Sequence, residues 1–102
     1  MNKYQVVYSS AALEQLAEIF QYITEVLENP VSAHKTISKI IKRCGELSVF
    51  PKGSVVKYVI NKAELRSVKV NNFIVFYEVD DEQSKVIVRD VIYARRDVKN
   101  LV

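Results

Sequence analysis

Arginine and tyrosine side chains in the second half of the chain are the best candidates for chemistry. Arg66 lies in one apolar-rich run, and Tyr93, Arg95 and Arg96 lie together at the end of another. A guanidinium group binds phosphate or carboxylate through paired hydrogen bonds, and tyrosine stacks on bases. Arginine also stabilises the charge that develops during phosphodiester cleavage. These four residues therefore predict a site for RNA or for an acidic protein surface.

The same arginines have a second interpretation that involves no partner. Successive residues of a strand face opposite sides of a sheet, so Arg95 and Arg96 are expected on opposite faces, with Tyr93 on the face of Arg95. One arginine would then face a partner while the other pairs with a carboxylate of the chain. Arg66 and Arg96 could equally be half-buried ion-pair residues that hold the edge of the sheet. The sequence leaves both interpretations open.

The charges of the chain are unevenly distributed around a net charge of +3 at pH 7. Residues 10–30 contain four glutamates and no base, whereas residues 35–69 contain nine bases and two glutamates, a balance of +7. Such asymmetry favours an acidic or polyanionic partner, and Lys39, Lys42 and Arg43 are expected to contribute to its binding. The alternative is an ordinary solvated face of lysines.

The residue inventory argues against several kinds of active site. The chain has one histidine, His34, one cysteine, Cys44, and two glycines. A zinc site needs clustered ligands, and a phosphate-cradling loop needs several glycines, so neither a metal nor a cofactor is expected. No run is apolar enough for a signal peptide or a membrane span, which predicts a cytoplasmic protein.

Two helices are predicted in the first half of the chain. Apolar residues recur at helical spacing over residues 10–27, and Ser9 or Ser10 can cap the start of this helix. Asn29-Pro30 then marks the start of a second helix that ends before Pro51, because asparagine caps a helix and proline fits its first turn. The short link between them predicts an antiparallel helical hairpin.

Strands are predicted on both sides of this hairpin. Residues 3–8 form the first candidate, and residues 65–70, 73–79 and 86–94 read as a three-strand antiparallel meander with a tight turn at Asn71-Asn72. Residues 55–60 are a further possible strand. The run 73–79 is apolar on nearly every residue, which predicts a central strand covered on both faces. The expected fold is a single α+β domain over residues 1–102, with the helical hairpin packed on a small antiparallel sheet.

The chain resembles the RelE/ParE superfamily of toxins from bacterial type II toxin–antitoxin systems. The resemblance spans almost the whole chain and rests on the order and spacing of several segments. These are YQVVYS (4–9), IFQYI (19–23), LSVFP (47–51), LRS (65–67), NFIVFYEV (72–79) and VIYARRD (91–97). The resemblance implies the same fold that periodicity predicts, and it implies a cognate antitoxin as partner.

Within the superfamily, the chain looks closer to the ParE-like members. Their LRS, FYEV and RRD motifs match directly, and such toxins are associated with inhibition of DNA gyrase. RelE-like members cleave mRNA on the ribosome without a metal. Ile74 stands where the first arginine of RelE-like members is expected, whereas Arg95 matches the second. The position of their C-terminal tyrosine falls near Leu101, and the tyrosine itself is absent from this chain.

The resemblance leaves three functions to weigh. The first is a toxin that binds and poisons gyrase, and the second is a ribosome-dependent mRNA endonuclease with Arg66, Tyr93 and Arg95 as its catalytic candidates. The third is a member that only binds its antitoxin. In each case Lys39, Lys42, Arg43, Arg66, Arg95 and Arg96 are the expected partner-binding residues.

Overall fold

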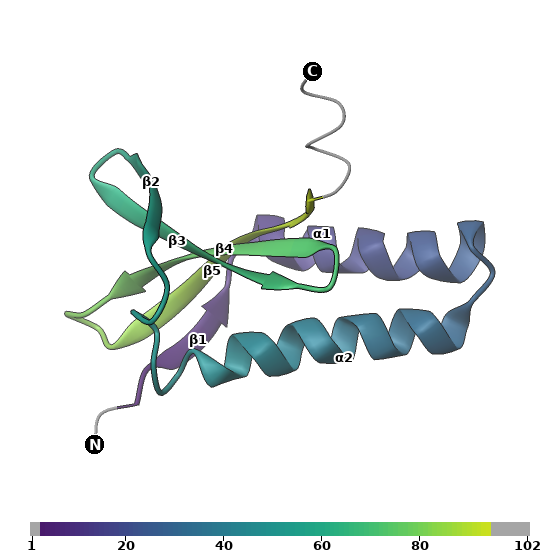
Figure 1. The fold of residues 1–102 in the computed structure, drawn as a ribbon, viewed down its shortest axis with the longest axis horizontal. Helices are drawn as coiled ribbons and strands as arrows, with labels where there is room; N and C mark the ends of the chain where they lie inside the picture. Colours follow the sequence, from purple (N-terminus) through teal and green to yellow (C-terminus); the bar gives the residue numbers. More distant parts are fainter. Residues whose placement is uncertain (1–2, 95–102) are drawn as a thin grey trace.

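The computed structural model describes residues 3–94, and their arrangement confirms the predicted α+β fold (Figure 1). The chain begins with β1 (Gln5–Tyr8) and continues with α1 (Ser10–Gln21), a single π-helical turn η1 (Tyr22–Val26) and α2 (Pro30–Glu46). The remaining elements are β2 (Val56–Ile60), β3 (Ala63–Val70), β4 (Phe73–Asp80) and β5 (Lys85–Tyr93). The predicted single helix over residues 10–27 is therefore α1 extended by η1.

The helices begin at the predicted caps. The Ser9 side chain accepts a hydrogen bond from the Ala12 backbone N–H at 3.0 Å, and the Asn29 side chain accepts one from Ser32 at 3.1 Å. Pro30 occupies the first turn of α2, where its missing N–H leaves no hydrogen bond unmade. None of the helices in residues 3–94 is long and apolar enough to span a membrane.

The five strands form one sheet in the order β1-β5-β4-β3-β2. Strands β2 to β5 are antiparallel neighbours, but β1 runs parallel to β5, so the sheet is mixed rather than wholly antiparallel. Strands β1 and β5 are not joined by a hairpin. The chain passes directly from β1 into α1, which runs along the remaining part of the β5 edge. There Gln15 accepts a hydrogen bond from the Val91 N–H at 2.7 Å and thereby covers that edge.

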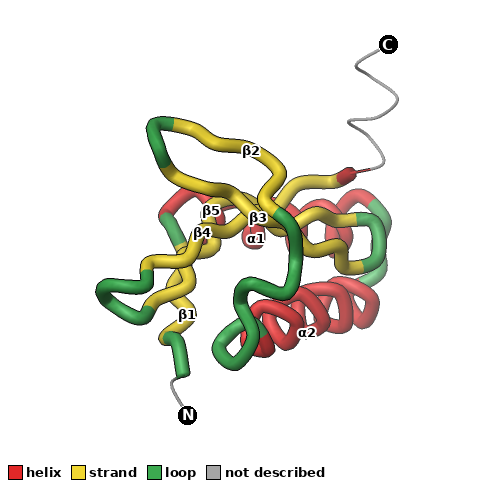
Figure 2. Tube along the Cα trace, turned by 60° about the vertical axis from the view of Figure 1, so that its left-hand side comes forward, coloured by secondary structure: helices red, strands yellow, loops and turns green. Residues whose placement is uncertain are grey.

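The core lies between the two helices and one face of the sheet (Figure 2). Tyr77 and Val75 of β4 are fully buried there, together with Ile40 and Cys44 of α2. The prediction that β4 is central is confirmed. The prediction that it is covered on both faces is wrong for the described residues, because the alternate side chains, including Phe76, are only partly buried on the face without helices.

Candidate partner-binding surface

Arg66 lies on β3 directly opposite Tyr77 of β4, and its side chain is partly buried. Its guanidinium donates a hydrogen bond to the backbone carbonyl of Ser54. The Tyr77 hydroxyl donates to the carbonyl of Pro51 at 2.7 Å and also lies 2.6 Å from the Ser54 hydroxyl. Together these contacts tie the segment that follows α2 to the centre of the sheet. In this structure Arg66 holds a loop through a carbonyl, not through the ion pair considered above.

Tyr93 lies at the far end of the same face of the sheet. It pairs with Phe73 of β4, and the centroids of the two rings are 5.3 Å apart. It also lines an open groove between the end of the sheet and the α1–η1 segment, with Ile19, Tyr22 and Asn72 among its neighbours there.

The structure does not bring Arg66 and Tyr93 together. Their partners on β4, Tyr77 and Phe73, are four residues apart, which places them roughly 13 Å apart along the strand. Arg95 and Arg96 lie outside the described residues. Of the predicted nuclease residues, the two that the structure places are therefore separated by the buried centre of the sheet.

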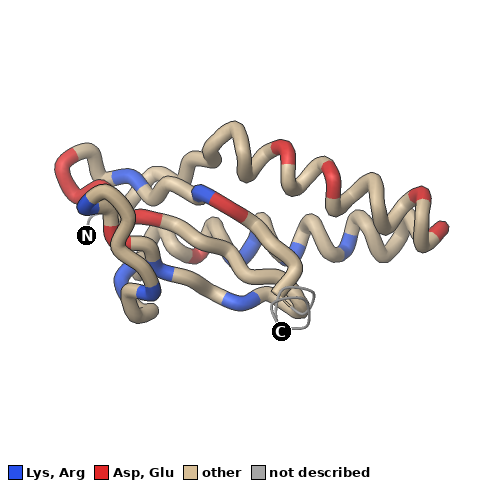
Figure 3. Tube along the Cα trace, turned by 90° about the horizontal axis from the view of Figure 1, so that it is seen from above, with Lys and Arg blue, Asp and Glu red and all other residues tan. Residues whose placement is uncertain are grey.

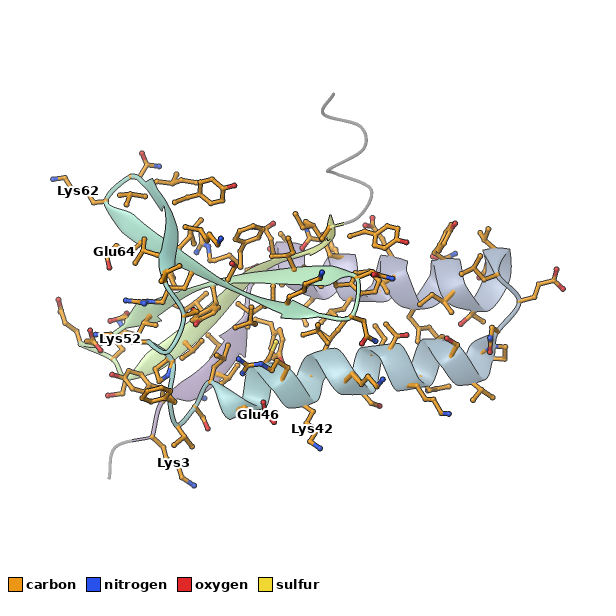
Figure 4. The ribbon with its side chains drawn as sticks, viewed as in Figure 1. Lys3, Lys42, Glu46, Lys52, Lys62 and Glu64 are labelled. Carbon is orange, nitrogen blue, oxygen red and sulfur yellow. The ribbon has the colours of Figure 1, made fainter. Side chains whose placement is uncertain are left out.

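The basic residues of α2 face solvent. Lys39 and Lys42 are exposed, and Arg43, whose side chain is 39% exposed, lies 3.5 Å from the carboxylate of Glu46. Such an exposed ion pair adds little stability, so Arg43 remains available to a partner. Figure 3 shows the acidic residues of α1 along one helix and the basic residues of α2 along the other. Figure 4 shows Lys42 pointing away from the sheet. The predicted separation of charge is thus present on the surface.

A second group of contacts, on the surface, holds the turn that contains Lys52. Lys52 Nζ lies 2.6 Å from Asp81 Oδ2, and the Tyr4 hydroxyl donates to Asp81 Oδ1 at 2.7 Å. The hydrogen bonds from Lys52 and then from Tyr4 lower the pKa of Asp81 below its usual value. The bond to Asp81 raises the pKa of Lys52 and of Tyr4. The turn is thereby fixed to both the β4–β5 connection and the start of the chain.

An exposed apolar strip, which the sequence did not mark as functional, lies next to this turn. The side chains of Phe50, Val55, Val56, Tyr58, Val59 and Ile60, here called the β2 strip, are all exposed. Their exposed fractions range from 37% to 74%, with Phe50 the highest. The available signal was the run VVKYVI at residues 55–60, in which Lys57 is the only polar side chain. A strand with one solvated face would alternate, so this run has more apolar surface than its own chain covers.

The single histidine and cysteine do not form a reactive pair. His34 packs edge-on against Phe20, with ring centroids 5.0 Å apart. Cys44 is fully buried in the core, and burial raises the pKa of its thiol, which keeps it protonated at neutral pH. In residues 3–94, no three side chains of His, Cys, Asp or Glu gather as a metal site would need.

Several solved structures share this fold. A chain of the chromosomal ParDE toxin–antitoxin system from P. aeruginosa aligns with a TM-score of 0.73 and 16% identity, covering 89% of this chain and 96% of that one. A chain of the RelBE2 toxin–antitoxin complex from Mycobacterium tuberculosis gives 0.66 and 19%, covering 91% and 93%. The isolated E. coli RelE toxin gives 0.58 and 19%, covering 97% and 99%. No curated protein sequence matches the chain.

Two helices on one face of a five-stranded mixed sheet therefore place this chain in the structural class of the RelE and ParE toxins. A sequence model of one family within that class, the ParE toxin of the type II toxin–antitoxin system parDE, matches residues 6–98. The chain belongs to this family of toxins.

Proposed function

We propose that this protein is the growth-inhibiting toxin of a type II toxin–antitoxin pair. In this proposal it inhibits DNA gyrase, which is the activity associated with ParE-like toxins. Membership of the ParE family carries the proposal. The contacts of Arg66 and Tyr93 support it, because Arg66 binds the Ser54 carbonyl and Tyr93 packs against Phe73, so neither side chain is directed toward the other. The predicted cytoplasmic location is part of the same proposal.

A cognate antitoxin is the partner in this proposal. One of the similar solved structures, the RelBE2 assembly from Mycobacterium tuberculosis, is a toxin–antitoxin complex, and a matching arrangement here would neutralise the toxin by covering its surface. Lys39, Lys42 and Arg43 would meet acidic residues of the antitoxin, since charge complementarity steers association. Arg66 would contribute indirectly by holding the loop that it binds, and the predicted roles of Arg95 and Arg96 stand as proposals.

A second function, ribosome-dependent cleavage of mRNA, is favoured by one observation. The basic segment of residues 35–69 suits a nucleic acid as well as an acidic protein. In that case Arg95 and Tyr93 would be the residues to change first, because Arg66 already has a structural partner.

Two assays on the purified protein separate these functions. The first measures supercoiling by gyrase, and the second measures cleavage of ribosome-bound mRNA. Inhibited supercoiling with intact mRNA is the expected result. Cleavage that is lost in Arg95→Ala, in a variant that keeps its fold, would replace the gyrase proposal with the nuclease one. A folded protein without either effect would overturn both and leave antitoxin binding alone.

A further inference from the structure

The helical hairpin formed by α1 and α2 has a face that is turned away from the sheet. On α1, Gln15 accepts a hydrogen bond from the backbone of β5 and thereby marks the side that meets the sheet. The ring contact between Phe20 and His34 marks the sides on which the two helices meet. At 3.6 residues per turn, Leu13 and Ala17 lie opposite Gln15, and both are exposed. They therefore belong to the outer side of the hairpin.

The corresponding side of α2 is also open. Ile40 and Cys44 are buried in the core, and Val31 and Ser38 lie on the opposite side of the helix. Ile41 lies on the side near α1 and is 41% exposed, while Val31 is 64% exposed. The outer face of the hairpin is defined here as Leu13, Ala17, Val31, Ser38 and Ile41. It combines exposed apolar side chains with two small residues, which let another helix approach closely.

Charged residues of opposite sign border this outer face on its two sides. On α1, two glutamates that are four residues apart lie opposite Phe20, on the edge away from α2. They form the acidic rim, Glu14 and Glu18. On α2, lysines spaced by four and three residues form the basic rim, Lys35, Lys39 and Lys42. All five side chains are exposed, and among the described residues none of them makes an ion pair.

The two rims are matched in height along the hairpin. The helices run in opposite directions from the connection around Glu28 (Figure 1). Glu14 and Lys42 are each fourteen residues from Glu28, and Glu18 and Lys39 are ten and eleven residues from it. At 1.5 Å per residue, each glutamate is level with its lysine to within about 3 Å. Within one molecule they lie on different edges, so they face no opposite charge across the hairpin.

A second copy of the chain would supply those opposite charges. If two outer faces meet about a two-fold axis parallel to the helices, α1 of each copy lies over α2 of the other, and heights along the hairpin are preserved. Glu14 then faces Lys42 of the second copy, and Glu18 faces Lys39 of the second copy. An axis across the helices would instead place α1 on α1 and bring acid against acid. The charges therefore select one of the two symmetric arrangements.

Other kinds of occupant match this face less well. An acidic protein segment or a nucleic acid would be attracted by the basic rim and repelled by the acidic rim beside it. A second copy carries both signs at matching heights, and its own outer face would bury the apolar residues between the rims.

We propose that, in the absence of antitoxin, two copies of this chain pair through the outer faces of their helical hairpins as a symmetric four-helix dimer. This inference does not depend on the proposed function. Lys39 and Lys42 are also the residues proposed above to meet the antitoxin, so the antitoxin and a second copy would exclude each other.

The first test measures the mass of the purified full-length toxin by sedimentation equilibrium. We expect a dimer at about 100 μM protein, with a Kd below that concentration. Two double variants reverse one rim each, Glu14→Lys with Glu18→Lys and Lys39→Glu with Lys42→Glu. Each alone should raise the Kd at least about tenfold, because attractions across the interface become repulsions. An equimolar mixture of the two variants should form a dimer again, since each reversed rim then meets its complement.

The matched control reverses two lysines that lie away from this face. Lys57→Glu with Lys62→Glu changes the net charge as much as the reversal of Lys39 and Lys42, but these residues lie on β2 and in the turn that follows it. This variant should keep the Kd of the wild type. An equal loss of dimer in this control would show that net charge, and not the rims, governs association, and would overturn the proposal.

A second test needs no variant. A carbodiimide joins a carboxylate to an amine that touches it, and a mixture of unlabelled and isotope-labelled wild type shows which links join two copies. We expect mixed-label peptides that link Glu18 to Lys39 and Glu14 to Lys42. A dimer without such peptides would place the contact on another surface and overturn the proposal, even if a reversed variant does not fold.

The remaining outcomes also decide the question. A wild type that sediments as a monomer at about 100 μM would overturn the proposal. So would reversed variants that dimerise as well as the wild type, or a mixture of two dissociated variants that does not pair. None of these samples contains antitoxin or gyrase, so a failure here leaves the proposed function to its own assays.

Discussion

Strands β2 and β4 lie on either side of β3 and have similar compositions but opposite environments. Both are rich in β-branched and aromatic residues, as VKYVI and FIVFYEVD show. Val75 and Tyr77 of β4 are fully buried, whereas every residue of β2 is exposed. Apolar composition thus shows that a strand is suited to burial. It does not show whether its own chain or a partner buries it.

The difference between the two strands follows from where the helices lie. They pack on one face of the sheet, and their main contacts with it are to β5 and β3 rather than to β2 (Figure 1). The stability of the monomer should therefore depend more on β4 than on β2. Four predictions test that difference.

The largest effect on stability is expected from Tyr77→Ala. Removal of a fully buried aromatic side chain from a core lowers the free energy of unfolding by about 3–5 kcal/mol. The matched change on the other strand, Tyr58→Ala, should cost less than about 1 kcal/mol, because Tyr58 is exposed and its main neighbour is the ring of Phe76. Urea unfolding of both variants measures the difference. Equal losses would show that β2 stabilises the monomer as much as β4.

A smaller effect is expected when only the Tyr77 hydroxyl is removed. Tyr77→Phe keeps the packing of the ring but leaves the buried Pro51 carbonyl and the Ser54 hydroxyl without this partner. We expect a loss of about 1–3 kcal/mol and faster hydrogen exchange in residues 51–55. Unchanged exchange there would mean that Arg66 alone fixes the turn that leads into β2.

A still smaller effect on stability is expected from a charge placed on the open edge. Val59→Lys should change the free energy of unfolding by no more than about 0.5 kcal/mol, because the side chain is exposed. It should also raise the solubility of the free protein, since charge on an edge strand opposes edge-to-edge association. Solubility and urea unfolding measured on the same sample test both points. A loss above about 1 kcal/mol would contradict the claim that β2 contributes little to the monomer.

The local patterns in the sequence predicted most of the fold. The spacing of apolar residues, the turn residues and the helix caps predicted the positions of both helices and of the three-strand meander. Asn71-Asn72 forms the predicted turn. The direction of β1 could not be predicted in this way, because its pairing with β5 joins residues about 80 positions apart and no short loop constrains it. The partial coverage of β4 was missed because apolar residues on both faces do not show what covers them.

The candidate site was less predictable than the fold. The type of residue at Arg66 predicted a phosphate or carboxylate contact, but its partner is the Ser54 carbonyl, which depends on the path of the loop after α2. The position of Tyr93 relative to Arg66 depends on the register of three strands, including the irregularity between Phe76 and Tyr77. The β2 strip was visible in the sequence as VVKYVI, yet its exposure required knowing that the helices lie mainly against β5 and β3.

The smallest effect is expected from the exposed contact between Lys52 and Asp81, in contrast to the buried hydrogen bond of the Tyr77 hydroxyl. Because the folded-state pKa of Asp81 is lowered, its contribution to stability is present at neutral pH and is lost as the pH falls through that value, below about pH 4. Asp81→Asn should therefore be slightly less stable than the wild type at pH 7, and the two should converge once the pH is below the lowered pKa of Asp81. The difference should also shrink at about 1 M salt, since the Lys52 and Asp81 side chains are 50% and 56% exposed and their attraction is screened. A difference that persists at low pH would show that Asp81 stabilises the turn through its shape and its bond from Tyr4, and that its charge contributes nothing.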